Sequence, residues 1–100
     1  MNPSEYEYEK FVEEHCLPYV DFPYTVVALN EEAGEIAGWH KKRNLRGNDS
    51  YTDQMLLEEF GDLLFYLVKA ASLKGWSLEQ VAAANIAKLT ERRQLNGIIG

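Results

Sequence analysis

The segment from Leu63 to Leu73 constrains the fold more than any other, because Lys69 is its only charged residue. A helix of this composition is apolar on nearly every side, so it is stable only where other parts of the protein cover most of its surface. Three further short helices in a chain of 100 residues would leave part of it open to water. The sequence therefore predicts a dimer or a higher oligomer, in which other copies complete the cover.

Helical periodicity runs along the chain, and no stretch shows the strict alternation of a β-strand. Ser4 with Glu7 and Ser77 with Gln80 match the capping box that opens a helix. We expect an all-α fold, a single domain over residues 1–100 that forms a four-helix bundle completed by oligomerisation. The expected helices cover residues 4–16, about 25–44, from 50 or 52 to 74, and 77–93.

Local signals mark where these helices begin and end. Ser50 or Thr52 is expected to cap the third helix, and Gly75 is expected to stop it. Pro18 and Pro23 should keep the link between the first two helices non-helical. On the second helix, apolar residues at helical spacing predict the face turned toward the core; they are Val26, Leu29, Ala33, Ile36 and Ala37.

The overall charge of the chain disfavours some classes of binding partner. The net charge is −6 and the isoelectric point is about 4.8, which argues against sequence-independent binding to nucleic acid or to an anionic membrane. Cys16 is the only cysteine, so the chain has no intramolecular disulfide, as in a reducing compartment. No signal peptide is visible, and the longest apolar run, LLFYLV, is too short to span a membrane. We expect a cytoplasmic protein.

The sequence contains two clusters of acidic residues at spacings that are unfavourable on a helix. Like charges three or four residues apart on a helix repel by roughly 0.2–0.5 kcal/mol per pair. The chain nevertheless contains two segments that each place three carboxylates within about one helical turn. The first cluster is Glu31, Glu32 and Glu35, and the second is Glu58, Glu59 and Asp62.

The spacing within the clusters suggests a shared metal ion. Glu32 and Glu35 project from one face of the second helix, and Glu59 and Asp62 from one face of the third. Both pairs adjoin apolar residues, where uncompensated charge is unfavourable. A divalent cation between the helices removes the repulsion, and oxygen ligands suit Mg²⁺, Mn²⁺ or Ca²⁺ rather than zinc. A single acidic cluster on a helix is more often a solvent-exposed face, but two clusters of this kind favour a metal site.

A di-iron carboxylate centre is excluded by the positions of the histidines. Such a centre needs Glu-x-x-His pairs. His15 and His40 are preceded three residues earlier by Val12 and Ala37.

At this point the motifs resemble those of a known family. EEAGE followed by EEFGD is similar to the Glu-Glu-x-x-Glu … Glu-x-x-Asp signature of MazG-like nucleotide pyrophosphohydrolases, in the all-α NTP pyrophosphatase superfamily. NIAKLTERR resembles the Asn-x-x-Lys … Arg segment that follows on the last helix of that family. The resemblance covers roughly residues 24 to 93.

The resemblance implies a helical, dimeric or tetrameric enzyme that hydrolyses nucleoside triphosphates to the monophosphate and pyrophosphate. The cofactor would be Mg²⁺, with Mn²⁺ as a substitute, and the role would be house-cleaning of non-canonical or excess nucleotides. Neither a nucleic-acid polymer nor a membrane would be a partner. Glu32, Glu35, Glu59 and Asp62 would be the metal ligands, and with Glu31 they would make up the catalytic set. Glu31 or Glu35 would orient the attacking water.

Three groups of residues are candidates for contact with the substrate. Asn85, Lys88 and Arg92 lie along one face of the last helix, where they either meet the nucleotide or form a solvated face. Trp39, one turn after Glu35, either stacks on a base or packs in the core. The basic run HKKRNLR, residues 40–46, either captures triphosphate or complements the end of the second helix.

Two alternatives to the pyrophosphohydrolase follow from the same residues. One is a non-enzymatic helical interaction domain whose acidic residues form a binding or solubility surface. The other is a phosphohydrolase that keeps the site but acts on another diphosphate-linked compound. A rise in melting temperature with Mg²⁺ and nucleotide would separate the enzyme from the interaction domain, because a ligand that binds only the folded state stabilises it.

Overall fold

The computed structural model describes residues 2–96, with side chains for residues 2–94. Over this range the chain is helical and contains no strand, so the all-α prediction is confirmed. None of the described helices is long and apolar enough to cross a bilayer. The four α-helices are α1 (Glu5–His15), α2 (Phe22–His40), α3 (Asp53–Leu73) and α4 (Leu78–Asn96), and a π-helical turn, η1 (Lys41–Leu45), extends α2.

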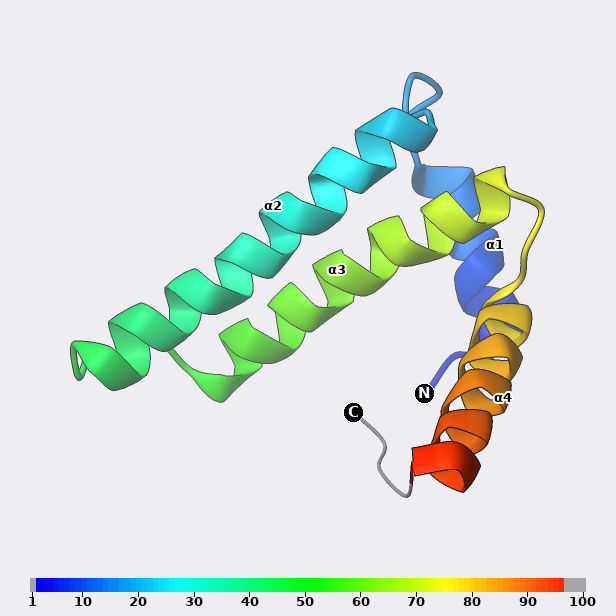
Figure 1. Ribbon diagram of the computed structural model, residues 1–100. Helices are drawn as coiled ribbons and strands as arrows, with labels where there is room; N and C mark the ends of the chain where they lie inside the picture. The colour runs from blue at the N-terminus through cyan, green and yellow to red at the C-terminus, as the bar shows by residue number, and fades with distance from the viewer. Residues whose placement is uncertain (1, 97–100) are drawn as a thin grey trace.

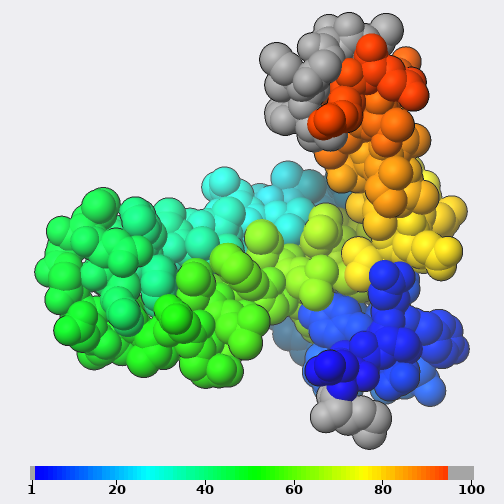
Figure 2. Space-filling view, turned by 90° about the horizontal axis from the view of Figure 1, so that it is seen from below, coloured from blue at the N-terminus to red at the C-terminus, as the bar shows by residue number. Residues whose placement is uncertain are grey.

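The centre of the fold is a long antiparallel hairpin made of α2 and α3 (Figure 1). α1 and α4 pack at the end of this hairpin that lies away from η1, where both contact α3 and each other. Figure 2 shows α1 and α4 on opposite sides of that end, with α4 projecting away from the hairpin. Over the described residues α4 has no contact with α2. The single chain therefore does not close into a four-helix bundle by itself, and completion by oligomerisation stays a prediction.

The helix ends follow the predicted local chemistry. The Ser77 side chain accepts a hydrogen bond from the Gln80 N–H at 3.1 Å, and the Gln80 side chain accepts one from the Ser77 N–H at 2.8 Å. Thr52, rather than Ser50, caps α3. Gly75 adopts a φ of +79°, the left-handed conformation that a glycine reaches without strain, and the chain turns there from α3 toward α4.

The predicted start of the second helix was wrong by one turn. α2 begins at Phe22 and not near Thr25, with Pro23 inside its first turn. Proline is tolerated there, because an N–H in the first turn has no intrahelical partner in any case. Asp21 supplies the cap by accepting a hydrogen bond from the Tyr24 N–H at 3.0 Å. Pro18 remains in the non-helical link.

The predicted core face of the second helix was only partly right. Leu29 and Ile36 are half-buried, but Val26 is 51% exposed, and the fully buried positions are Thr25 and Ala28. The buried face is thus rotated around the helix toward the predicted acidic pair. This rotation matters for function, because it turns Glu32 toward α3.

The core of the single chain is small. Its buried residues are Val12, Val20, Thr25, Ala28, Val68, Ala70 and Ala71. The radius of gyration is 16.3 Å, against about 13 Å for a compact domain of this length. Within the Leu63–Leu73 segment of α3, Leu67 is 38% and Leu73 42% exposed, so the chain alone does not supply all the cover that this segment was predicted to need.

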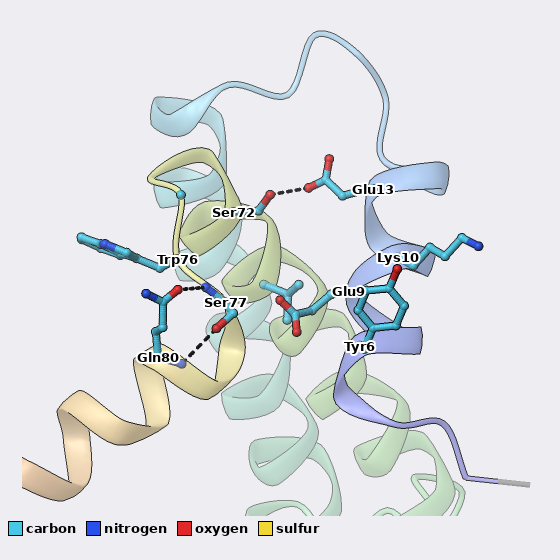
Figure 3. Close-up of a pocket in the computed structure, with 10 residues that line it drawn as sticks. Tyr6, Glu9, Lys10, Glu13, Ser72, Trp76, Ser77 and Gln80 are labelled. Carbon is cyan, nitrogen blue, oxygen red and sulfur yellow. Dashed lines mark hydrogen bonds between the residues drawn. The ribbon is translucent and has the colours of Figure 1, made fainter.

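A crevice of about 490 Å³ marks the junction where α1, α3 and the start of α4 meet (Figure 3). Glu13 on α1 accepts hydrogen bonds from the Ser72 hydroxyl at 2.5 Å and from the Lys69 ammonium at 3.3 Å. Glu9, one turn earlier, accepts one from the Leu78 N–H at the start of α4 at 3.3 Å. Both carboxylates of the crevice therefore have partners within the fold, and α1 contacts both α3 and the start of α4.

Candidate metal centre

Three carboxylates from the two acidic motifs converge in the middle of the hairpin. Glu32 on α2 and Glu59 and Asp62 on α3 each offer an oxygen, and these oxygens all lie within 4.8 Å of one another. Glu32 and Glu59 are half-buried and Asp62 is exposed. The hairpin thus brings together residues that the sequence separates by the whole α2–α3 connection.

The electrostatics of this cluster are unfavourable without a cation. Burial, followed by the charges of Asp62 and Glu35, raises the pKa of Glu59. Burial, followed by the charges of Asp62 and Glu59, raises the pKa of Glu32. In both residues the charged form loses hydration and faces like charges.

One oxygen of the cluster lacks any partner. Glu59 Oε2 is buried, and within the described part of the chain it accepts no hydrogen bond. A buried polar atom of this kind is unfavourable, and proteins normally pair it. A divalent cation fits this position, because the donor set is made entirely of carboxylate oxygens, which hard cations such as Mg²⁺ prefer.

The two remaining predicted carboxylates lie outside the tight group. Glu35 lies near it, since its charge contributes to the raised pKa of Glu59 and both residues line the same small cavity. Glu31 lines a groove on α2 beside Tyr24 and Val27, and its charge, like that of Glu35, contributes to the raised pKa of Glu32. The geometry therefore separates three ligand candidates from two neighbouring acids on α2. The individual roles stay predictions.

Comparison with protein families supports the same assignment. The family model described as the MazG nucleotide pyrophosphohydrolase domain matches residues 23–95. This chain belongs to the MazG family. No curated protein and no solved structure matches it significantly. Membership implies a nucleotide pyrophosphohydrolase, and the matched residues include all of the predicted catalytic and substrate-binding residues.

Three tyrosines that the sequence interpretation did not single out surround the acidic cluster of this MazG chain. Burial and the charge of Asp62 raise the pKa of Tyr8 on α1. Burial, then Tyr24, then Glu32 raise the pKa of Tyr66 on α3. The rings of Tyr24 and Tyr66 lie 6.2 Å apart and span α2 and α3 next to Glu32. Tyr66 could have been found from its spacing, since it follows Asp62 by four residues on the same helical face.

Trp39 is placed beside the MazG acidic cluster, as its spacing from Glu35 predicted. Its indole N–H donates a hydrogen bond to the Thr52 carbonyl at 2.9 Å, so the side chain ties α2 to the start of α3. It also lines the small cavity shared by Glu35 and Glu59. This contact gives Trp39 a packing role, while stacking on a base stays a prediction.

The predicted substrate-binding residues of α4 are not brought to the cluster within one MazG chain. Asn85 and Lys88 are exposed, and Arg92 is half-buried. All three lie on the helix that diverges from the hairpin (Figure 2). Their contact with substrate stays a prediction, and it requires either a movement of α4 or a second subunit.

Proposed function

We propose that this protein is a Mg²⁺-dependent hydrolase that converts nucleoside triphosphates, ribo- or deoxyribo-, into the monophosphate and pyrophosphate. Its proposed role is the removal of non-canonical or excess nucleotides. The observation that carries the proposal is the convergence of Glu32, Glu59 and Asp62 around an unpartnered carboxylate oxygen. A cluster built for an interaction surface would gain nothing from turning that oxygen away from water.

Different residues of the chain would bind the metal ion and accept the proton. Glu32, Glu59 and Asp62 would hold the cation, with Glu35 beside them. The ion, when bound, would neutralise phosphate charge and favour ionisation of water. Glu35 is proposed to accept a proton from the attacking water, because it lines the same cavity as Glu59 while Glu31 lines a different groove.

The proposed reaction balances as a simple hydrolysis. The water oxygen forms a bond to a phosphorus atom of the triphosphate, and one proton passes to the carboxylate. The bond from that phosphorus to the oxygen that bridges the α and β phosphorus atoms breaks, and that oxygen leaves with the electron pair. Attack at the α or at the β phosphorus gives the same two products, a nucleoside monophosphate and pyrophosphate.

The working form is proposed to be a homodimer or a homotetramer. Large apolar side chains are exposed on α3 and α4, among them Phe60, Leu67 and Ile86, the last at 67%. A second copy packed on these faces would cover them. In such an assembly α4 of one subunit reaches the acidic cluster of another, so that Asn85 and Lys88 act across the interface.

A release assay tests the proposed function. The purified protein is incubated with Mg²⁺ and a panel of canonical and modified NTPs and dNTPs, and monophosphate and pyrophosphate are both quantified. We expect equal amounts of the two products for at least one substrate, and none from the Glu59→Gln variant. Absence of both products across the panel, or release of single phosphates, would contradict the proposal.

A further inference from the structure

A small cavity of about 60 Å³ opens beside the acidic cluster, toward the η1 end of the hairpin. One wall comes from α2 and η1, and the other comes from Tyr51, just before α3, and from the first part of α3. The lining residues are Glu35, Gly38, Trp39, Lys42, Tyr51, Met55 and Glu59. The sequence offers a role in triphosphate capture only for the basic run 40–46 as a whole, and the cavity singles out Lys42, the only cationic residue in its lining.

The wall that carries Lys42 is one continuous helical face. Glu35, Trp39 and Lys42 follow one another at intervals of four and three residues, the spacing that aligns side chains on a helix. The same face therefore leads from a carboxylate of the cluster to a positive charge. The exposed neighbour Lys41 does not line the cavity, although it carries the same charge one residue earlier.

The position of Lys42 is supported by its surroundings. Its ammonium lies 5.2 Å from the centre of the Tyr51 ring, a distance at which the ring attracts a cation. The Arg43 guanidinium donates a hydrogen bond to the Tyr51 carbonyl, and Trp39 donates one to the next carbonyl, that of Thr52. Two side chains of α2 and η1 thus fix the backbone on which the Tyr51 ring is mounted.

Lys42 forms no ion pair with any of the described residues. The two ion pairs found there join Lys10 with Glu14 and Lys69 with Glu13. Lys42 lines the same cavity as Glu35 and Glu59 without pairing with either. The cavity therefore has carboxylates on one side, which suit a cation. On the other side it has an ammonium group that forms no ion pair with the described residues.

The charges that line the cavity favour one kind of occupant. A compact anion that is itself chelated by a divalent cation satisfies both sides, the cation on the carboxylates and the anion on the ammonium. We propose that Lys42 binds the diphosphate end of the metal-chelated triphosphate, the part released as pyrophosphate. This inference rests on the proposed function.

The test measures binding of inorganic pyrophosphate in the presence of Mg²⁺ by titration calorimetry, without turnover. Loss of a charge-assisted contact at a partly exposed site should weaken this binding by about tenfold in Lys42→Ala. Lys42→Arg should keep most of the affinity, because it keeps the charge. The matched control is Lys41→Ala, which removes the same charge outside the cavity and should change the affinity less than about twofold.

A second ligand separates a local contact from general charge attraction. Binding of a nucleoside monophosphate with Mg²⁺ should be the same in Lys42→Ala and in the wild type. Equal pyrophosphate affinity in Lys42→Ala and wild type, equal losses in Lys41→Ala and Lys42→Ala, or no binding of Mg²⁺-pyrophosphate to the wild type would each overturn the inference.

The two proposals fail in different ways. If Mg²⁺-pyrophosphate binding depends on Lys42 but no NTP is cleaved, the diphosphate site stands and the proposed hydrolysis fails. If NTPs are cleaved but pyrophosphate binding ignores Lys42, the hydrolysis stands and the role of Lys42 fails.

Discussion

Glu32 on α2 and Asp62 on α3 place carboxylate oxygens within 4.8 Å of each other, and Glu59 brings a third oxygen into the same group. Like charges at this separation oppose folding, because each carboxylate raises the free energy of the charged form of the others. The arrangement is therefore a strained feature of the metal-free protein, which a divalent cation would relieve. Removing one of these charges should therefore lower the activity but leave unchanged or raise the stability of the metal-free protein.

Amide replacement of the cluster should separate activity from stability. Glu32→Gln, Glu59→Gln and Asp62→Asn keep the shape of the side chain and remove its charge. Pyrophosphate release should fall at least about 100-fold, since even partners of metal ligands contribute about 10- to 100-fold. The melting temperature of the metal-free protein should stay or rise, because repulsion is relieved.

Glu58→Gln is the matched control for these variants. Glu58 belongs to the same acidic motif but is exposed and outside the three-carboxylate group. Its activity should remain close to that of the wild type. Near-normal activity in two of the cluster variants, or a lower melting temperature in all of them, would argue for a structural network and against a metal site.

The raised pKa of Glu59 predicts a pH dependence of stability for the metal-free protein. The folded-state pKa lies above the unfolded value of 4.5, so the folded state holds its proton over a range where the unfolded state has lost it. The contribution of Glu59 to stability is therefore fully present below about pH 4.5 and is lost as the pH rises through the folded pKa. Glu32 should add an effect of the same sign.

The measurement is the difference in melting temperature between Glu59→Gln and the wild type, without metal, from pH 4.5 upward. This difference should grow with pH, since only the wild type acquires the buried charge. Saturating Mg²⁺ should reverse the trend, because the ion binds the deprotonated carboxylates. A difference that is constant with pH would contradict the assignment of an uncompensated charge to Glu59.

Local chemistry explains what the sequence could predict. The Ser77–Gln80 capping box, the Thr52 cap and the Gly75 stop each involve residues a few positions apart, so their partners are visible in the sequence. The pairing of Glu32 with Glu59 and Asp62 needed one further assumption, that consecutive helices pack side by side. That assumption is safe for a short connection between two amphipathic helices.

Long-range packing explains what the sequence could not predict. Tyr8 approaches Asp62 because α1 packs on α3, and nothing near Tyr8 in the sequence announces that contact. The start of α4 likewise contacts α1, where Glu9 accepts a hydrogen bond from the Leu78 N–H, and these two residues are far apart in the sequence. Pro23 was misjudged for a local reason, because its effect depends on whether the helix begins just before it.

The α1–α3 junction should depend on Glu13. The hydrogen bond from Ser72, with support from Lys69, lowers the pKa of Glu13, so its contribution to stability is present above the unfolded pKa and lost as the pH falls through the folded pKa. Glu13→Ala should destabilise the protein by about 1 kcal/mol or less, since the pair is partly exposed and screened by solvent. Thermal melting should show a decrease of a few degrees.

Glu14→Ala provides the comparison for Glu13→Ala. Its ion pair with Lys10 is exposed, lies within one helix and spans 3.9 Å, so its loss should leave the melting temperature nearly unchanged. Equal effects of the two substitutions would show that the contacts of Glu13 with α3 do not stabilise the junction.

The exposed apolar face of α3 predicts self-association. Light scattering should give a mass of at least twice 11.5 kDa, and the melting temperature should rise with protein concentration. Leu67→Glu places a charge on this face at a position 38% exposed in the single chain, so it should shift the protein toward the monomer more than it perturbs the helix. A stable wild-type monomer of 11.5 kDa at micromolar concentration would refute the proposed oligomer.

The separation of Lys88 from the acidic cluster predicts complementation between inactive subunits. Glu59→Gln should be inactive through the metal site, and Lys88→Ala should be impaired through the substrate. If α4 serves the cluster of another subunit, a mixed dimer contains one doubly defective site and one intact site. Co-refolding the two variants in equal amounts should then restore about a quarter of wild-type activity, from random pairing of a two-fold dimer. If α4 serves its own chain, every site keeps one defect, and the mixture should be no more active than the average of its two components.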